Sequence, residues 1–309
     1  MDKFKRVLWI VLGLTIFLSL FFTRVQGVDG VTKKLIDQAM DLELETSWPH
    51  YTPNIYPVDI YKKNILKDTT LRYSENQWVE MKDKEPIYAL TMVRDPDGQA
   101  VLSVIDARSF RGLSDIGQFN RASSHIYYQA MIIHEAFHCF QADQGFYDAF
   151  AEEITKYEQG QALTIARQLD DDPKYQKLWD QEIQALITHG LEDEATYLTN
   201  YQECYQARKD YLIDKFGEEA AEEYLNYSSL YEKAEGTAQY MENIALCQLS
   251  GETLKLNYQG YTKGTAKYYQ SGFFKAYILD KHQGNQWKED FFRTSDQFED
   301  HLFAANSEK

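Results

Sequence analysis

Two histidines set one helical turn apart, with a glutamate between them, are the residues of this chain best suited to catalysis. They are His134 and His138, and Glu135 directly follows the first of them. Because residues four apart lie on the same face of an α-helix, both imidazoles can reach one metal ion. We predict zinc, which binds nitrogen and carboxylate ligands in tetrahedral geometry, and Glu135 lies where it can act on a nearby water molecule.

The residues around this motif have the spacing of an amphipathic helix. A row of apolar side chains recurs every three or four positions and predicts a face turned to the core. Its members are Ile126, Ala130, Ile133, Phe137 and Phe140. The two histidines border this row, which suits ligands at the wall of a cleft, and Gly145 is expected to end the helix.

A catalytic zinc site usually has three protein ligands and one open position, so a third ligand is required. In the metzincin pattern a glycine and a third histidine follow the motif, but Gln141 and Gln144 occupy those places here. That branch is therefore excluded. A glutamate on a later helix is the other common source of the third ligand.

Two glutamates, Glu232 and Glu235, compete for this position. Ser229 stands three residues before Glu232, and this spacing predicts a capping box that gives Glu232 a structural role. Glu235 is followed by Gly236 and flanked by alanines, although glycine costs a helix about 1 kcal/mol relative to alanine. We infer that small residues let this helix pack closely beside the histidine helix. We predict Glu235 as the third ligand, with Glu232 in reserve.

His134, His138 and Glu235 together resemble the gluzincin group of zincin metallopeptidases, and the resemblance covers two helices rather than the whole chain. It implies an active-site helix under a small antiparallel sheet or hairpin, and a helical C-terminal subdomain that carries the glutamate. It also implies hydrolysis of a peptide or protein substrate by a zinc-activated water, with Glu135 as general base. Better-known members place an aspartate four residues after the ligand glutamate. Gln239 stands there in this chain, and its neutral carbonyl would be a weaker partner for an imidazole N–H.

The reaction also needs a donor that stabilises negative charge on the carbonyl oxygen. Tyr269, on a predicted helix after Glu235, is the candidate for this role. An extended peptide could pair with the edge of a hairpin predicted at residues 87–107, just before the histidine helix. The remaining five of the seven histidines lack ligand spacing and are predicted to be structural or exposed.

The net charge of the chain excludes one class of binding partner. The formal net charge is −16, which argues against a nucleic-acid binder, since such a protein needs a basic face to contact phosphates.

Lys3, Lys5 and Arg6 precede an almost purely apolar run from Val7 to Phe22. This pattern predicts a signal peptide over residues 1–27 or, alternatively, an N-terminal membrane anchor. Either one predicts an extracytoplasmic protein, secreted or anchored.

The rest of the chain, residues 28–309, is predicted to form one α+β, mostly helical domain with a zincin-like fold. Residues 28–145 hold the sheet and the histidine helix, and residues 146–309 hold the helical part with the third ligand. Within this domain, residues 47–68 carry prolines and tyrosines and are predicted to be irregular.

One hairpin is well marked within the domain. Its two predicted strands, 87–94 and 100–107, flank Asp95–Gly98. The proline in this segment presets one backbone torsion and the glycine accepts a positive φ, so the segment is typical of a tight turn.

The chain has three cysteines, and an odd number leaves at least one thiol unpaired within the monomer. They are Cys139, Cys204 and Cys247. A pair between the last two stays open, and so does the alternative that all three are buried thiols.

Two other functions remain open on the sequence. The chain could be a zincin-type zinc protein that does not hydrolyse peptides. It could also be an exported helical binding protein in which the motif occurs by chance. Metal content separates the second of these from a zinc enzyme, and activity separates the first.

Overall fold

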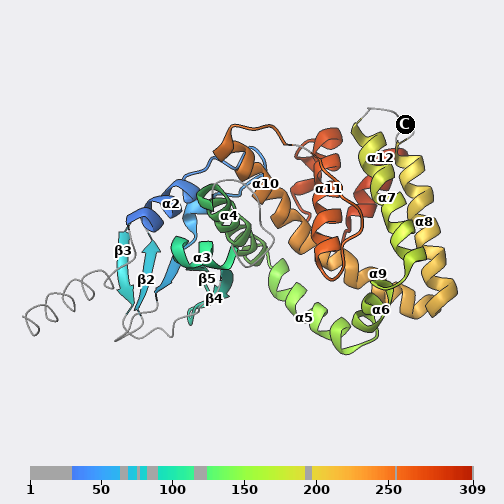
Figure 1. Cartoon of the computed structure of the whole chain (residues 1–309), viewed down its shortest axis with the longest axis horizontal. Helices are drawn as coiled ribbons and strands as arrows, with labels where there is room; N and C mark the ends of the chain where they lie inside the picture. The colour runs from blue at the N-terminus through green and yellow to red at the C-terminus, as the bar shows by residue number, and fades with distance from the viewer. Residues whose placement is uncertain are drawn as a thin grey trace, which may run out of the picture. The chain divides into compact units, whose positions relative to one another are not determined.

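The computed structural model describes residues 30–62, 69–74, 77–81, 90–114, 124–191, 197–254 and 256–307. It is α+β and mostly helical, as the sequence predicts, with one small sheet (Figure 1). The described chain divides into two compact units. The first holds the residues up to Gln38 and Asn54–Tyr128, and the second holds Ala39–Pro53 and the residues from Gln129 onward. The predicted signal peptide or anchor, residues 1–27, lies outside the described residues.

The first unit contains a five-stranded sheet. Its strands are β1 (Val58–Lys62), β2 (Thr69–Ser74), β3 (Gln77–Met81), β4 (Thr91–Arg94) and β5 (Ala100–Ile105). Their order is β3-β2-β1-β5-β4; β1 and β5 are parallel, and the other neighbours are antiparallel. The antiparallel sheet predicted from the sequence is therefore wrong for this central pair. The chain forms the edge strand β4 first and then turns back into β5, which runs in the same direction as its other neighbour, β1.

The predicted hairpin is confirmed by β4 and β5. Arg94 pairs with Ala100, and Gly98 in the turn has a φ of 82°. The Asp95 carboxylate accepts hydrogen bonds from the backbone N–H groups of Asp97 and Gln99, each 3.1 Å long. Side chain and glycine thus fix the turn that the sequence marks.

The region 47–68, predicted to be irregular, contains β1, so the prediction is wrong there. The strand is buried on both faces and shows no alternation of apolar and polar residues. Asp59, its second residue, is only 3% exposed. Its carboxylate accepts hydrogen bonds of 2.8 and 3.1 Å from the guanidinium of Arg72 on β2. A strand buried on both faces is usually recognised as a continuous apolar run, and the charged Asp59 interrupts that run in the sequence.

Helices make up the second unit. They are α4 (Ser124–Asp143), α5 (Phe146–Gln159), α6 (Ala162–Leu169), α7 (Pro173–Leu191), α8 (Tyr197–Phe216), α9 (Glu218–Tyr231), α10 (Thr237–Ser250), α11 (Ala266–Gln283) and α12 (Phe298–Ser307). A π-helical segment, Glu232–Gly236, joins α9 to α10 without interruption, and we call it the π-turn. Gly145, Gly217 and Gly251 have positive φ and follow helix ends, as the sequence predicts for Gly145, and Pro173 begins α7. The remaining helices are α2 (Gly30–Met40) and α3 (Ala107–Ser114).

The helix that carries the histidines, α4, is fixed by its apolar face. Ala130, Ile133 and Phe137 are completely buried, as predicted. The Tyr51 hydroxyl donates a 3.2 Å hydrogen bond to the carbonyl of Ile133. The rings of Trp48 and Phe137 meet edge to face with centroids 4.9 Å apart. Packing on this side therefore determines where the histidine side of α4 points.

Several basic side chains are buried in the second unit. Those below 5% exposure are Arg208, Lys233, Lys267, Lys275 and Lys288. The Lys275 amine donates hydrogen bonds of 2.6 Å to Glu232 and 2.5 Å to Glu299. The Arg208 guanidinium donates two to Glu182. Because a buried charge is very costly unless it is paired, these ion pairs hold specific helices together.

Candidate metal centre

The structure brings His134 and His138 of α4 together with Glu235 of the π-turn. One ligand atom of each lies within 4.8 Å of the others. The residues are 4%, 3% and 8% exposed, respectively. Both Nε2 atoms face the carboxylate: Glu235 Oε2 is 3.4 Å from His134 Nε2 and 3.3 Å from His138 Nε2. The three residues proposed as ligands therefore form one buried group.

These distances fit ligands around a cation better than direct hydrogen bonds. With metal–ligand distances of about 2.0–2.1 Å, two ligands of a tetrahedral zinc ion lie about 3.3–3.4 Å apart. A charge-assisted N–H···O hydrogen bond is instead about 2.7–2.9 Å long. Two imidazoles and one carboxylate are also a donor set that catalytic zinc sites use, with a fourth position left open. The group therefore fits zinc.

The second nitrogen of each imidazole is held by a different side chain. His134 Nδ1 is 3.1 Å from a carboxylate oxygen of Glu242 on α10. His138 Nδ1 is 2.8 Å from the side-chain oxygen of Gln141 on α4. When Nδ1 donates its hydrogen to such a partner, the lone pair of Nε2 is free to bind a metal.

Gln239 is the imidazole partner expected from the sequence, and the structure contradicts this. Its side-chain oxygen is buried and has no hydrogen-bond partner among the described residues. The partner of His134 is Glu242, which follows the ligand Glu235 by seven residues rather than four. A π-turn has i→i+5 hydrogen bonds, so it rotates the residues after it relative to a regular helix. The seven-residue spacing to a second acidic residue is the signal that could have found Glu242.

The electrostatics of the group favour positive charge between its side chains. Burial opposes a charged His134, but the nearby carboxylates of Glu235 and Glu242 outweigh it and raise its pKa well above the usual range. Burial likewise opposes a charged His138, and the Glu235 carboxylate raises its pKa above the usual value. Burial alone would raise the pKa of Glu235, yet the two histidines lower it far below the usual range. A divalent cation would supply the same positive charge.

Glu135, the predicted general base, lies on the partly exposed edge of α4 beside both histidines. Burial raises the pKa of its carboxyl group, and the charges of His134 and His138 only partly oppose this. A carboxylate whose pKa lies above its ordinary value is a better proton acceptor near neutral pH. Its position and its basicity therefore suit the predicted role.

Two tyrosines flank the group. The ring of Tyr269, the predicted donor, is nearly parallel to that of His134, with centroids 6.1 Å apart. Burial, the Glu235 charge and a hydrogen bond with Glu235 raise the pKa of Tyr269. Tyr147 of α5, not predicted from the sequence, has its ring 5.0 Å from that of His138, and burial raises its pKa as well. Both hydroxyls keep their protons at neutral pH, and among 23 tyrosines no sequence signal marks Tyr147.

Glu232, the reserve ligand, is bound elsewhere. Its carboxylate accepts hydrogen bonds from Ser271 and Lys275 of α11. The predicted capping box with Ser229 is wrong, because α9 continues into the π-turn and no helix begins there. Glu232 is therefore a structural residue, but its partner lies 43 residues further along the chain.

Gly236 permits a backbone-to-backbone contact, although not the one predicted. It was expected to face the histidine helix, and it packs instead on Gly272 of α11. A Cβ on Gly236 would lie 2.4 Å from the Gly272 Cα, and one on Gly272 would lie 2.4 Å from the carbonyl oxygen of Glu232. This contact fixes the π-turn, and with it Glu235, against α11.

Replacing Gly236 with alanine is expected to lower the free energy of unfolding by about 1–3 kcal/mol, as overpacking typically does. The added methyl meets backbone atoms, which cannot move aside as a side chain can. Urea denaturation measures the change. Gly30→Ala is the matched control, because Gly30 begins α2 and a Cβ there meets nothing within 4 Å. Equal stability of Gly236→Ala and the parent would contradict the contact.

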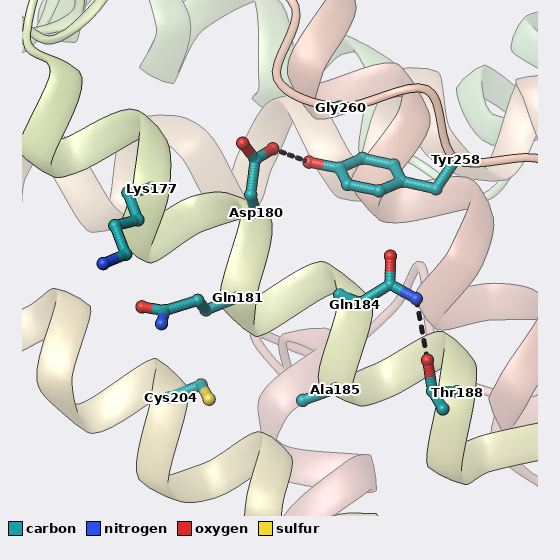
Figure 2. A pocket seen from close by; sticks show the side chains of 9 residues that line it. All are labelled: Lys177, Asp180, Gln181, Gln184, Ala185, Thr188, Cys204, Tyr258 and Gly260. Atoms are coloured by element: carbon teal, nitrogen blue, oxygen red, sulfur yellow. Dashed lines mark hydrogen bonds between the residues drawn. The ribbon is translucent and has the colours of Figure 1, made fainter.

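A groove of about 700 Å³ lies apart from these residues, beside α7 and α8 (Figure 2). None of the three proposed ligands lines it. Two pairs of its polar groups bond to each other: the Tyr258 hydroxyl donates to Asp180, and the Gln184 amide donates to Thr188. We assign no part of the chemistry to it.

The three cysteines, all within the described part of the chain, form no disulfide bond with one another. Cys139 is buried, and Cys204 and Cys247 are partly exposed. The pair between Cys204 and Cys247 that the sequence left open is not formed. Cys139, which follows His138 in the chain, is completely buried.

Comparison with known proteins identifies no relative: no family model, curated protein or solved structure matches this chain. Among the described residues, no helix has the length and apolar character needed to cross a membrane.

Proposed function

We propose that this chain is a zinc-dependent hydrolase that cleaves peptide bonds in the manner of gluzincins. The observation that supports this best is the buried group of His134, His138 and Glu235, in which one carboxylate oxygen lies 3.3–3.4 Å from the Nε2 atoms of both imidazoles. The neighbouring Glu135 supplies a base. Action outside the cytoplasm on a peptide or protein substrate is part of the proposal and rests on the sequence alone.

The residues divide the work in the proposed reaction. When bound, zinc supplies a Lewis acid that polarises a carbonyl group and acidifies water. Glu135 takes the proton of the attacking water and delivers it to the amine that leaves. Tyr269 or Tyr147 donates a hydrogen bond to the oxygen on which negative charge develops. Glu242 and Gln141 keep the imidazoles oriented.

Metal content tests the proposal directly. The purified protein is expected to contain about one zinc ion per chain by elemental analysis, since three converging ligands are present. Glu235→Gln removes the only anionic ligand of the group and should weaken zinc binding by more than the roughly 10–100-fold that outer partners cost. Chelator competition measures the affinity of both proteins.

Glu222→Gln, an exposed glutamate on α9, is the matched control and should bind zinc like the parent. A parent protein without zinc, which takes none up from buffer, would refute the proposal and favour a chance motif. A zinc-loaded parent that cleaves no member of a mixed peptide library would retain the metal site and reject the peptidase.

A further inference from the structure

One buried glutamine connects two of the proposed metal ligands. Gln141 is 0% exposed and lies one turn after His138 on α4. Its side-chain oxygen is 2.8 Å from His138 Nδ1. Its side-chain nitrogen donates to the carbonyl of Ala234, at 2.8 Å, and to the hydroxyl of Thr237, at 2.9 Å. Ala234 and Thr237 lie on either side of Glu235 in the chain, so one amide joins α4 to the ligand-bearing segment.

The direction of every hydrogen bond in this set follows from the partners. The carbonyl of Ala234 can only accept, so the NH₂ group of Gln141 must face it. The oxygen of Gln141 then faces His138 Nδ1, which must carry a hydrogen, and Nε2 keeps its lone pair for a metal. The Thr237 hydroxyl donates in turn to the carbonyl of Lys233, at 2.6 Å. The same hydroxyl also lies 3.2 Å from the carbonyl of Ala234, so in either case it donates to a backbone carbonyl and accepts from Gln141.

We propose that Gln141 is a positioning residue that sets two ligands at once, the tautomer of His138 and the place of Glu235. This inference rests on the proposed zinc site. The partner of His134, Glu242, is a carboxylate and can only accept hydrogen bonds when ionised. Gln141 needs an amide instead, because it must accept from the imidazole and donate to the π-turn with the same group.

Gln141→Glu separates this role from that of an ordinary imidazole partner. A carboxylate at this position would accept the Nδ1 hydrogen at least as well and would make His138 a more basic ligand. It would have no N–H to donate to Ala234 or Thr237, and one carboxylate oxygen would face the carbonyl oxygen of Ala234. We expect Gln141→Glu to bind zinc about 10–100-fold more weakly than the parent, as loss of an outer partner does. A simple partner role predicts equal or tighter binding.

Two further variants protect the test against misfolding. Gln144→Glu makes the same change at a half-buried position just after α4 and should bind zinc like the parent. Thr237→Val removes one acceptor of the Gln141 amide from the other side and should weaken zinc binding about two- to tenfold. The double variant of Gln141 and Thr237 should lose less than the sum of the two single losses, since both break the same set.

Zinc affinity by chelator competition is the main measurement, and circular dichroism confirms folding of each variant. Zinc binding by Gln141→Glu equal to or tighter than the parent's would overturn the inference and leave the zinc site intact. Should Gln141→Glu fail to fold, parent-like affinity of Thr237→Val would overturn it equally. A parent that binds no zinc would refute the proposed function itself, so the two failures are distinct.

Discussion

Glu135→Gln is expected to retain zinc and to lose turnover by about 10²–10⁴-fold, the usual contribution of a general base. Glutamine has nearly the same shape, so α4 and both histidines keep their places. It cannot accept the proton of the attacking water. The raised pKa of Glu135 strengthens the argument, because burial makes this carboxylate more basic than an exposed one. Cleavage of internally quenched peptides by the zinc-loaded proteins measures kcat and KM.

Glu152→Gln is the control for this substitution. Glu152 lies on α5 with its side chain 74% exposed, so the same chemical change there should leave kcat unaltered. If Glu135→Gln cleaved peptides as fast as the parent, the proposed mechanism would be wrong. If it lost its zinc, Glu135 would belong to the metal-binding group instead.

Lys275→Met is expected to lower the free energy of unfolding by about 3–5 kcal/mol, because it leaves two buried carboxylates without their cation. Lys275 is 1% exposed and is hydrogen-bonded to Glu232 and Glu299. Burial lowers its pKa, but the two carboxylates outweigh that effect and raise it above the usual value. Tyr201 also donates to Glu299, at 2.9 Å. Urea denaturation followed by circular dichroism measures the loss.

Lys156→Met removes a lysine from an ion pair on the surface and serves as the control. Lys156 is 2.6 Å from Glu153, but its side chain is 57% exposed, so solvent screens the pair and little change is expected. Adding Glu232→Gln to Lys275→Met should recover part of the loss, because one stranded charge is removed. Equal stability of Lys275→Met and the parent would mean that the buried pairs do not stabilise the fold.

Local spacing sufficed for the elements that follow one face or one turn. The apolar row on α4, the hairpin turn at Asp95–Gly98 and the end of α4 before Gly145 all depend on neighbouring residues. His134 and His138 belong to this class, because four residues of helix bring them together. Glu235 could be predicted as a ligand only because catalytic zinc sites usually have three protein ligands, since no local pattern connects Glu235 to α4.

The features that could not be predicted from the sequence are those in which a buried polar group has its partner elsewhere in the chain. Asp59 concealed β1 because Arg72 comes thirteen residues later. Glu242 was missed because the family pattern points to the fourth residue after Glu235, whereas Glu242 is the seventh. Tyr147 is one of 23 tyrosines, and only packing places it beside His138. These features depend on tertiary structure, which periodicity does not record.

The carboxylate of Glu235, the proposed ligand, lies midway along one continuous helical segment from Glu218 to Ser250. This segment contacts α11 where Gly236 packs on Gly272. Its location is therefore set by main-chain packing before any ion arrives, and the imidazoles are likewise held in advance. Under the proposed function, zinc binding would then require little reorganisation, in contrast to small zinc-dependent folds that are unfolded without metal. Such a protein would survive a chelating environment as an intact scaffold and regain its ion when zinc returned.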